Sequence, residues 1–388
     1  MHNIQTELRK FVAPEFVFGV GARHMSARYA KNFGASKVLI VTDPGIIASG
    51  WTKEVTDNME SAGIPYHLFS AVTPNPKAKE IMTGAEEYVR EHCDTIVVIG
   101  GGSPIDCAKG IGVVSSNRKH ILDFEGVDQV MNPGPPLICI PTTAGSSADV
   151  SQFAIITDTD RKVKIAIISK TVVPDVSLID PFALTTMPGN LTANTGMDAL
   201  CHAFEAYVSS ASSPVTDLFA LEAVRLVSSS LIRALELPDD IAMRSNTMLG
   251  SLYAGLAFSN ASLGLVHAMA HSLGGYLDSP HGESNSILLS HVVGFNFEAA
   301  AEKYASIGEA LGASMIGLDA SEQKSVLLRA LEKLREELNI DVSLSEIGVK
   351  RSDISKLAVR PLNDPCLATN PRRSTQKDIE LLYERALS

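Results

Sequence analysis

Five side chains in the second half of the sequence have the types and spacing of a metal site. Asp198 and His202 lie four residues apart in GMDALCHAFEAY, and His267 and His271 have the same spacing in HAMAHSLGGYL. Residues four apart on a helix share one face. His281 follows in a Pro-His-Gly turn. One carboxylate and four imidazoles offer only N and O donors, which suits Fe²⁺, Zn²⁺, Mn²⁺ or Ni²⁺.

Each helical pair also has a simpler explanation, because most such pairs lie on a solvated face or satisfy one another. Two pairs and a turn histidine together favour a metal, but their spacing does not determine which four of the five side chains bind it. His271 shares a helix face with His267, and a neutral imidazole is suited to proton transfer near pH 7. We therefore take His271 as a candidate catalytic proton relay; the alternative is a structural role beside the metal.

The stretch VVIGGGSPIDCAKG predicts a strand that turns into a helix at a run of glycines. Ser103 is the expected N-cap, Pro104 the first helical residue, and Asp106 completes a box-like pattern. Glycines there let a phosphate approach the positive end of a helix. The stretch departs from the dinucleotide fingerprint G-x-G-x-x-G, since Ile105 replaces the last glycine. A tight turn without a ligand is the alternative.

Two other loops support a nucleotide site at the same sheet edge. Asp43 ends a strand in VTDPG, where a carboxylate would hold a ribose diol and repel a 2′-phosphate, favouring NAD over NADP. PTTAGSS (141–147) is a second loop of small and hydroxyl residues after a strand. With the glycine turn, these loops predict a bound dinucleotide.

The elements that must position these residues differ between the two halves of the chain. The first half alternates apolar strands with helices, which predicts a parallel sheet covered on both faces. Its expected strands are 37–43, 95–102, 136–146 and 173–181, its helices 49–62, 77–92 and 104–115, and its hairpin 154–169 with the turn at Asp158 to Arg161. After Pro188 the apolar spacing is helical, with expected helices 191–209, 214–236, 240–258, 262–277, 284–311, 321–338 and 376–387.

The predicted fold is thus an α/β N-terminal nucleotide-binding domain with a parallel sheet (1–187), followed by an all-α metal-binding C-terminal domain (188–388). The link lies near 182–190, where Pro and Gly occur in FALTTMPGN. Two domains of unlike class commonly meet at a cleft, and clefts hold sites.

Composition narrows the possible partners. The 388 residues are 45% hydrophobic and carry a net charge of −11, which argues against nucleic acid or a membrane surface as a partner. We see no apolar run long enough to span a bilayer, and MHNIQTELRKF lacks the apolar core of a signal peptide. Five scattered cysteines without a C-x-x-C pair suggest reduced thiols and a cytoplasmic location.

From about residue 11 to the C-terminus, the sequence resembles the iron-containing (group III) alcohol dehydrogenases. The resemblance rests on the order and separation of GGGSPIDCAK, IPTTAGSSADV, GMDALCHAFEAY, HAMAHSLGGYLDSPHGESN and DPCLATNPR. It implies an NAD-dependent alcohol dehydrogenase or aldehyde reductase that acts on a small alcohol or aldehyde and forms a homo-oligomer. A divalent metal, Fe²⁺ or with the same ligands Zn²⁺, would polarise the substrate oxygen while hydride moves to or from nicotinamide.

The resemblance also implies roles for individual residues. It makes Asp198, His202, His267 and His281 the metal ligands and leaves His271 beside the metal as a non-ligand. The residues that it places around the dinucleotide are Asp43, Asn75, Gly101, Gly102, Ser103, Asp106, Thr142, Thr143 and Lys164.

Two segments depart from the family pattern. Ser146-Ser147-Ala148-Asp149 stands where T-G-S-E is usual, and HGESN, with Glu283 and Ser284, replaces H-G-x-A-N. The first departure concerns nicotinamide or substrate contact, and the second places a charge near the metal. The alternatives are another enzyme on the same scaffold (a polyol dehydrogenase, a hydroxyacid–oxoacid transhydrogenase or a lyase) and a non-catalytic regulatory protein.

Overall fold

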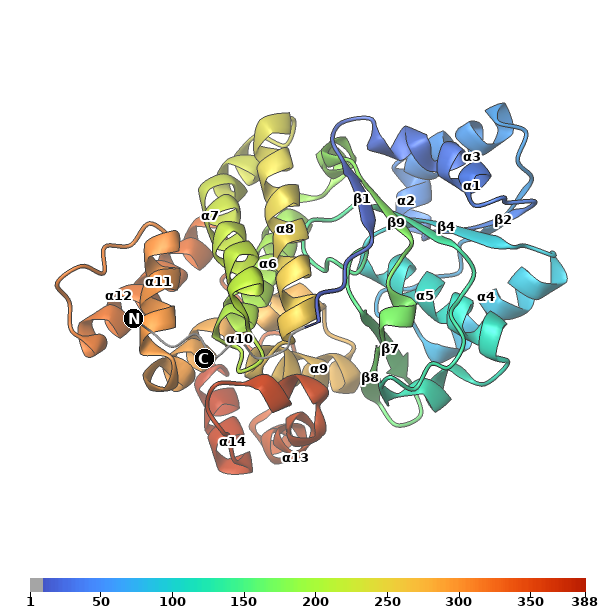
Figure 1. Ribbon diagram of the computed structural model, residues 1–388. Helices are drawn as coiled ribbons and strands as arrows, with labels where there is room; N and C mark the ends of the chain where they lie inside the picture. Colours follow the sequence, from blue (N-terminus) through green and yellow to red (C-terminus); the bar gives the residue numbers. More distant parts are fainter. Residues whose placement is uncertain (1–9) are drawn as a thin grey trace.

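The computed structural model describes residues 10–388. Residues 1–9, and with them the start of the expected 1–187 domain and most of MHNIQTELRKF, lie outside the described residues. Figure 1 shows an α/β half on one side of the molecule and a helical half on the other, with strands β7 and β8 between them. The predicted fold class is confirmed.

A six-stranded parallel sheet forms the centre of the α/β half, in the order β1-β9-β6-β4-β2-β3. Its strands are β1 (Glu15–Phe18), β2 (Val38–Val41), β3 (Tyr66–Phe69), β4 (Thr95–Gly100), β6 (Leu137–Pro141) and β9 (Val176–Ile179). The helices around it are α1 (Ser26–Asn32), α2 (Pro44–Ala48), α3 (Trp51–Ser61), α4 (Ala78–Arg90) and α5 (Gly102–Asn117).

The central strands are apolar throughout because helices cover both faces of the sheet. Val38 and Ile40 of β2 pack in the cluster that includes residues of α1 and α3. Leu39 and Val41 alternate to the opposite face and pack with residues of α4 and α5. This cover fixes the strands so that their carboxyl ends present loops along one edge of the sheet.

A smaller sheet joins the two halves. Strands β7 (Phe153–Asp158) and β8 (Val163–Ile168) form the predicted antiparallel hairpin, and the short β5 (Gly126–Val127) pairs with β8 in parallel. The glycines of helix α9 lie directly on β8: a Cβ on Gly275 would be 2.7 Å from the Cα of Val163. The contact brings the backbone of the hairpin against the helical half.

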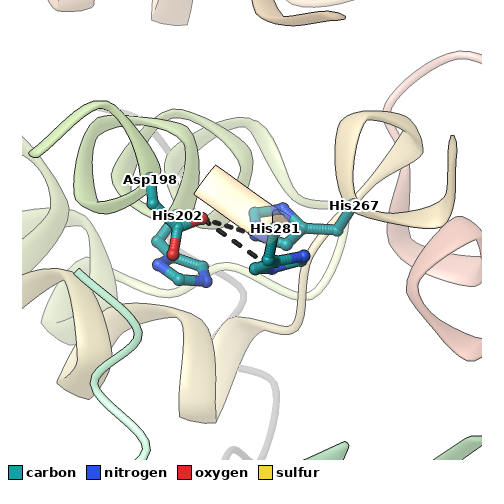
Figure 2. Close-up of side chains that lie close together, drawn as sticks. All are labelled: Asp198, His202, His267 and His281. Carbon is teal, nitrogen blue, oxygen red and sulfur yellow. Dashed lines mark ion pairs between the residues drawn. The ribbon is translucent and has the colours of Figure 1, made fainter. Parts of the chain in front are cut away.

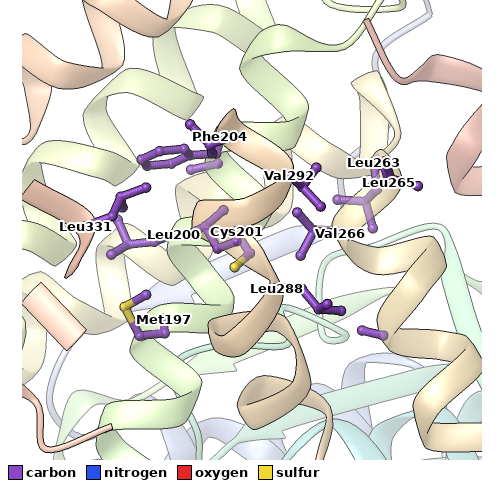
Figure 3. Packing of buried hydrophobic residues seen from close by; sticks show 14 of the residues in the cluster. Met197, Leu200, Cys201, Phe204, Leu263, Leu265, Val266, Leu288, Val292 and Leu331 are labelled. Carbon is purple, nitrogen blue, oxygen red and sulfur yellow. The ribbon is translucent and has the colours of Figure 1, made fainter. Parts of the chain in front are cut away.

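Helix α6 is the centre of the helical half and is buried on nearly every side from Thr192 to Val208. Figure 3 shows Met197, Leu200 and Phe204 of α6 packed among side chains of α9, α10 and α12. The helices are α6 (Gly189–Val208), α7 (Pro214–Glu236), α8 (Ile241–Ala261), α9 (Leu265–Leu277), α10 (His281–Asn296), α11 (Ala301–Ala310), α12 (Ala320–Glu337), α13 (Ile354–Val359) and α14 (Gln376–Arg385). Polar side chains on α6 are therefore forced into the interior.

Several expected elements differ from the structure. Strands β1 and β3 were not expected, because these edge strands are partly exposed and lack the continuous apolar character of the central ones. The expected helix 284–311 is two helices separated by the 3₁₀ turn Phe297–Ala299. Ser103 is not an N-cap: α5 begins at Gly102, and the Ser103 hydroxyl instead accepts a hydrogen bond from the Asn75 N–H at 3.2 Å.

The junction between the halves contains the only tryptophan of the sequence. Trp51 is buried, and its Nε1 donates to the Thr186 hydroxyl at 2.8 Å, in the 3₁₀ segment Pro181–Thr186 that leads to α6. The ring of Phe182 packs edge-on against the indole, with centroids 5.8 Å apart, and Cζ of Arg23 lies 5.0 Å from the centroid of the Trp51 ring. The link is thus packed rather than extended.

Two expectations about the whole chain can be compared with the structure. All five cysteines are buried and free. Within residues 10–388, no individual helix combines the length and apolar character needed to cross a bilayer; α8 and α9 meet that test only as a pair bent by 98°.

Candidate active site

The helical half brings together four of the five side chains predicted to bind metal. Asp198 and His202 come from α6, His267 from α9, and His281 from the first position of α10. One donor atom from each lies within 4.8 Å of the others. Figure 2 shows the four side chains turned toward a common point. Nε2 of His267 and Nε2 of His281 each lie 3.8 Å from Asp198 Oδ1.

Hydrogen bonds on the far side of two rings fix which nitrogen faces this point. His202 donates from Nδ1 to the Gly145 carbonyl at 3.1 Å, and His267 donates from Nδ1 to Glu205 Oε2 at 2.7 Å. Nε2 of each ring therefore faces the other donors. Imidazole ligands of metals are commonly oriented in this way.

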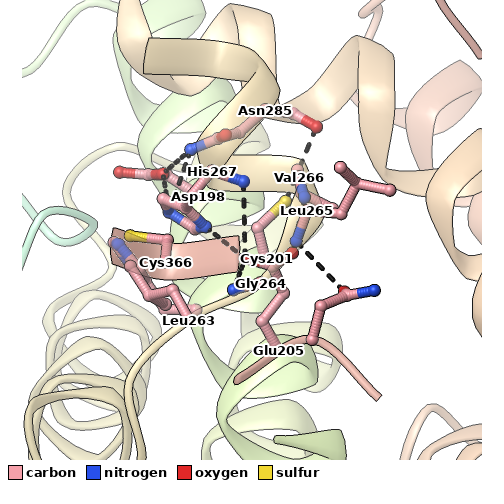
Figure 4. Close-up of polar contacts among 12 residues, drawn as sticks. Asp198, Cys201, Glu205, Leu263, Gly264, Leu265, Val266, His267, Asn285 and Cys366 are labelled. Atoms are coloured by element: carbon pink, nitrogen blue, oxygen red, sulfur yellow. Dashed lines mark hydrogen bonds and ion pairs between the residues drawn. The ribbon is translucent and has the colours of Figure 1, made fainter. Parts of the chain in front are cut away.

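Glu205 was not among the residues predicted from the sequence, although it belongs to GMDALCHAFEAY and follows Asp198 by two helical turns. Besides His267, its carboxylate accepts hydrogen bonds from the N–H groups of Gly264 at 2.9 Å and Val266 at 2.6 Å, where α9 begins (Figure 4). The spacing of seven residues on one helix face was the available signal. Glu205 joins α6 to the start of α9 and sets the position of His267.

Asn285 is a second missed residue. Its Nδ2 donates to Asp198 Oδ1 at 2.6 Å and lies 3.1 Å and 3.2 Å from Nε2 of His267 and of His281. It follows His281 by one helical turn, so both side chains face the same centre. Asn285 holds the carboxylate that the sequence predicts as a ligand.

The protonation of Asp198, His202 and His281 suits a cation. Burial lowers the pKa of His202 to about 3, against the attraction of Asp198, and burial also lowers the pKa of His281. Burial opposes ionisation of Asp198, but its three histidine neighbours hold its pKa well below the usual range. In a buried place, a carboxylate and neutral imidazoles with converging lone pairs are satisfied by a divalent ion. The donor set therefore fits a metal.

His267 is the exception among the imidazoles. Burial lowers its pKa, but the nearby carboxylate of Asp198 at 3.8 Å and the hydrogen-bonded carboxylate of Glu205 at 2.7 Å outweigh burial and raise it to about 9. Without a metal, this ring carries a proton between two carboxylates. A metal ion bound at Nε2 must displace that proton.

His271 lies beside these four residues and has a partner of its own. Its ring is stacked on that of His281, with centroids 5.5 Å apart, and its Nδ1 donates to Asp364 Oδ2 at 2.8 Å. Asp364 opens the DPCLATNPR segment, whose role was left open between covering the cleft and packing the helices. The segment forms a second hydrogen bond to α9, in which Asn370 Oδ1 accepts from the Leu265 N–H at 3.1 Å.

The predicted nucleotide loops meet at the carboxyl edge of the large sheet. Strands β2, β4 and β6 are neighbours, so Asp43, the Gly101–Ser103 turn and Thr142–Thr143 lie along one edge. From β2 the chain crosses to β3 on one side, and from β4 to β6 on the other. A ligand in a parallel sheet binds at such a switch point.

Small residues bring these loops close together. A Cβ on Gly101 would lie 3.0 Å from Thr143 Cγ2, and one on Gly102 would lie 2.9 Å from the Ser146 side chain. No side chain in residues 10–388 caps the start of α5, and the buried Thr142 hydroxyl has no hydrogen-bond partner in the described part of the chain. Free helix N–H groups and an unpaired hydroxyl fit a phosphate-bearing dinucleotide.

The other predicted dinucleotide residues already have partners. Lys164 Nζ donates to Asn75 Oδ1 at 2.8 Å, and Asn75 Nδ2 donates to Asp278 Oδ1, at the end of α9, at 2.7 Å. Asp106 accepts from the Ile155 N–H at 3.2 Å, and burial raises its pKa to about 6. Asp43 caps α2 through the Ile46 N–H at 3.0 Å. The hydrogen bonds from Lys164 through Asn75 to Asp278 link the predicted nucleotide-binding edge of the sheet to the end of α9.

One departure from the family pattern is explained by the structure. Asp149 is buried, and its Oδ2 accepts a hydrogen bond from the Ser177 hydroxyl of β9 at 2.6 Å. Asp149, which is shorter than the glutamate usual at this position, therefore anchors its loop to the sheet. Glu283 lies partly exposed in the first turn of α10, two residues after His281.

Comparisons with known proteins agree with this geometry. Residues 13–181 match the family described as iron-containing alcohol dehydrogenase, and residues 192–387 match its C-terminal part. A 1,3-propanediol dehydrogenase of Citrobacter freundii is 40% identical over 371 residues, which is 95% of this chain and 96% of the relative.

The chain belongs to the iron-containing alcohol dehydrogenase family.

Other members of the iron-containing alcohol dehydrogenase family point the same way. The NAD-dependent methanol dehydrogenase of Bacillus methanolicus is 39% identical over 377 residues, covering 97% of this chain and 99% of that one. The crystal structure of a 1,3-propanediol oxidoreductase superposes with a TM-score of 0.95 at 38% identity, covering 98% and 100% of the two chains. This protein is an NAD-dependent, metal-containing oxidoreductase that interconverts alcohols and aldehydes.

Proposed function

We propose that Asp198, His202, His267 and His281 hold one Fe²⁺, and that this centre interconverts a small alcohol and its aldehyde. The observation that carries the proposal is the convergence of the four donor atoms within 4.8 Å. When bound, a divalent ion on one carboxylate and three neutral imidazoles would leave a net charge of +1 for the substrate oxygen, and nicotinamide would give or take the hydride.

The residues of the chain have three tasks in this proposal. Glu205, Asn285 and the Gly145 carbonyl orient the ligands, as the hydrogen bonds above describe. The loops after β2, β4 and β6, with Asn75, Asp106 and Lys164, hold the dinucleotide so that its nicotinamide faces α9. The deep burial of Asp198, His202 and His267, each no more than 3% exposed, keeps water from the reacting groups.

His271 is the proposed proton relay. Asp364 holds its Nδ1, so Nε2 remains to receive or return the proton of the alcohol. Its position one helical turn after His267 and beside His281 supports the role. The reacting oxygen would thereby exchange its proton without direct contact with bulk water.

Small substrates are proposed because the relatives named above act on propanediol and methanol, and a lactaldehyde reductase of Escherichia coli is 35% identical over 371 residues.

We also propose a cytoplasmic homo-oligomer. Five free buried thiols support the location, and the exposed Phe16 on the edge strand β1 supports self-association. Light scattering of the purified protein tests the oligomer.

The division into domains 1–187 and 188–388 is likewise a proposal. Separate hydrophobic clusters in the sheet half and the helical half support it. A further cluster packs Ala144 and Ile179 against Met248 and Leu252 of α8. The two domains therefore share a core at their junction.

The decisive experiment is metal analysis of anaerobically purified protein, alongside NADH formation from methanol, ethanol and propane-1,3-diol. We expect one iron per chain and alcohol-dependent NADH. Asp198→Ala should lose both iron and activity, whereas Asp57→Ala, on the exposed surface of α3, should keep both. Iron retained at full occupancy in Asp198→Ala would contradict the ligand assignment. A metal-loaded protein that reduces no NAD with any alcohol would contradict the proposed substrate class.

A further inference from the structure

A second group of metal-binding side chains lies next to the first and does not share its donors. It consists of His271 on α9 together with Asp364 and Cys366, which flank Pro365 at the start of the 3₁₀ segment Pro365–Thr369. One donor atom from each lies within 4.8 Å of the others. His271 and Cys366 are buried, and the Asp364 side chain is 10% exposed. Cys366 is among the side chains drawn beside Asp198 and His267 in Figure 4.

The group differs from the first in its chemistry. The first set offers only nitrogen and oxygen, whereas this one adds the sulfur of Cys366. Zn²⁺ binds thiolate, imidazole and carboxylate together, and a thiolate discriminates in favour of Zn²⁺ over harder ions. The two sets therefore differ in which cation each prefers.

The carboxylate of Asp364 organises the group. Its Oδ2 accepts from His271 Nδ1 at 2.8 Å, and its Oδ1 accepts from the backbone N–H of Cys366 at 2.9 Å. The second bond fixes the direction of the carboxylate, and the 3₁₀ turn holds Cys366 beside it. The three donors are thus pre-arranged without a metal, which lowers the ordering cost of binding one.

We propose that His271, Asp364 and Cys366 form a second, inhibitory site for Zn²⁺. Two negative charges, from the carboxylate and the thiolate, would balance the two charges of the ion, so the buried complex would be neutral. A neutral complex is the form that a water-poor interior tolerates best. One carboxylate and three imidazoles in the first site do not balance a divalent ion in this way.

Binding requires a balanced exchange of protons. The thiol of Cys366 loses its proton to solvent as the Zn–S bond forms, and the Nδ1 proton of His271 is replaced by the metal while Nε2 takes up the ring proton. The step involves no oxidation or reduction. One proton is released for each Zn²⁺ bound.

The inhibitory consequence rests on the proposed function, because it requires His271 as proton relay. A ring that is bound to Zn²⁺ at one nitrogen and protonated at the other cannot accept the proton of the alcohol. The binding of Zn²⁺ itself does not depend on that role.

Co²⁺ distinguishes the second site by its spectrum. Metal-free full-length protein is titrated anaerobically with Co²⁺, and the near-ultraviolet absorption of thiolate-to-Co²⁺ charge transfer is recorded. The first site has no sulfur donor, so we expect this absorption to grow with the second equivalent of Co²⁺. Zn²⁺ added afterwards should remove it.

Variants test the assignment. Cys366→Ser should abolish the charge-transfer absorption, and Cys93→Ser, a buried thiol in the other half of the chain, should keep it. Should Cys366→Ser fail to fold, His271→Asn retains the thiol and should weaken Co²⁺ binding at the second equivalent at least about tenfold. Absence of the absorption in the parent protein, or its persistence in a folded Cys366→Ser variant, would overturn the site.

Kinetics test the inhibition separately. Zn²⁺ added to the iron-loaded enzyme should reduce kcat of the parent and of Cys93→Ser, and should do so at least about tenfold less effectively in Cys366→Ser. Equal inhibition of all three would overturn the inhibitory role. An enzyme without alcohol-dependent NADH formation but with the Cys366-dependent absorption would count against the proposed function alone.

Discussion

The buried carboxylate of Glu205 shows how one side chain prepares the site. It receives the ring N–H of His267 and two backbone N–H groups at the start of α9. The same group therefore sets the position of a helix and the orientation of a ligand. In the proposed site, the metal-facing nitrogen of His267 would depend on a residue that does not itself bind the metal.

Glu205→Gln should lower the affinity for Fe²⁺ about 10- to 100-fold, because the amide offers one acceptor oxygen where the carboxylate offers two. Competition with a chromophoric chelator under anaerobic conditions measures the change. Glu222→Gln, which alters an exposed pair with Arg225 on α7, is the control and should bind Fe²⁺ like the parent. An unchanged affinity in Glu205→Gln would show that His267 is oriented by other contacts.

Asp364→Asn should lower kcat at least about tenfold while iron content stays at the parent level, because the proposed relay ring of His271 would lose its orientation but the four proposed ligands would keep theirs. The measurement is kcat and iron per chain on the same preparation. Loss of iron in this variant would place Asp364 in support of the metal rather than of His271.

The proposed contact between Lys164 and the dinucleotide predicts a pH dependence of cofactor binding. Burial lowers its pKa to about 8, and the nearby Lys77 adds to this effect, while Asp278, Asp198 and Asp106 oppose it. Its ammonium is charged below about pH 8 and neutral above, so the dissociation constant of NADH should rise as pH increases through that value. Fluorescence titration with NADH checks this, and Lys164→Met should remove the step. A constant affinity across this range in the parent would exclude a charged contact from Lys164.

The sequence was sufficient to predict five candidate donors, and the family resemblance to select four of them, but neither predicted what orients these side chains. Asp198, His202, His267, His271 and His281 are recognisable as candidates because helical spacing and residue type are both local properties. Asp364 lies 93 positions from His271 along the chain, so no local pattern could pair them. Asn285 and Ser103 were in quoted motifs, yet their partners depend on how distant segments pack.

The contact between α9 and β8 explains an otherwise unfavourable pair of glycines within a helix. Gly275 lies against the backbone of Val163, and a Cβ on Gly274 would be 2.6 Å from the Cε of Lys164. The side chain of Lys164 therefore passes α9 at these glycines, and its Nζ donates to Asn75 Oδ1. The sequence shows the glycine pair but not the strand on which it rests.

Gly275→Ala should reduce the free energy of unfolding by about 1–3 kcal/mol, because the new methyl group meets the backbone of β8, which cannot yield as a side chain can. Chemical denaturation measures the loss. Gly294→Ala on α10, where the nearest atom would be 3.6 Å away, is the matched control and should be neutral or stabilising by up to about 1 kcal/mol. Equal stability of both variants would mean that α9 can shift away from β8.

Edge elements were the least predictable part of the fold. The central strands β2, β4 and β6 follow from continuous apolar runs, whereas β1 and β3 are partly exposed and have mixed sequences. Their pairing is determined by a free sheet edge rather than by their own residues. The break between α10 and α11 falls at the 3₁₀ turn Phe297–Ala299, where the buried Phe297 stacks on Tyr304 of α11 with ring centroids 5.6 Å apart.

At the scale of the whole molecule, the proposed metal would join α6 to the two consecutive helices α9 and α10, which lie far from α6 in the sequence. Its ligands come from α6, α9 and α10, which surround the core of the helical half. A ligand that binds only the folded state stabilises it in proportion to its affinity. The metal should therefore act as a structural as well as a catalytic component.

Removal of the metal should lower the Tm of the protein, and a metal concentration about 100 times the dissociation constant should contribute about 2.7 kcal/mol. Calorimetry with and without Fe²⁺ under anaerobic conditions measures the difference. Asp198→Ala should show one Tm under both conditions. A metal-dependent Tm that survives in Asp198→Ala would place the stabilising ion elsewhere.

The packing of Trp51 provides an intrinsic optical probe of the junction between the halves. It is the only indole in the sequence, and it is hydrogen-bonded to the segment that leads into α6. Fluorescence emission during denaturation will therefore report this junction, whereas far-ultraviolet circular dichroism will be dominated by the helical half. Coincident transitions would identify a single cooperative unit. An earlier fluorescence transition would show that the junction opens while the helices remain folded.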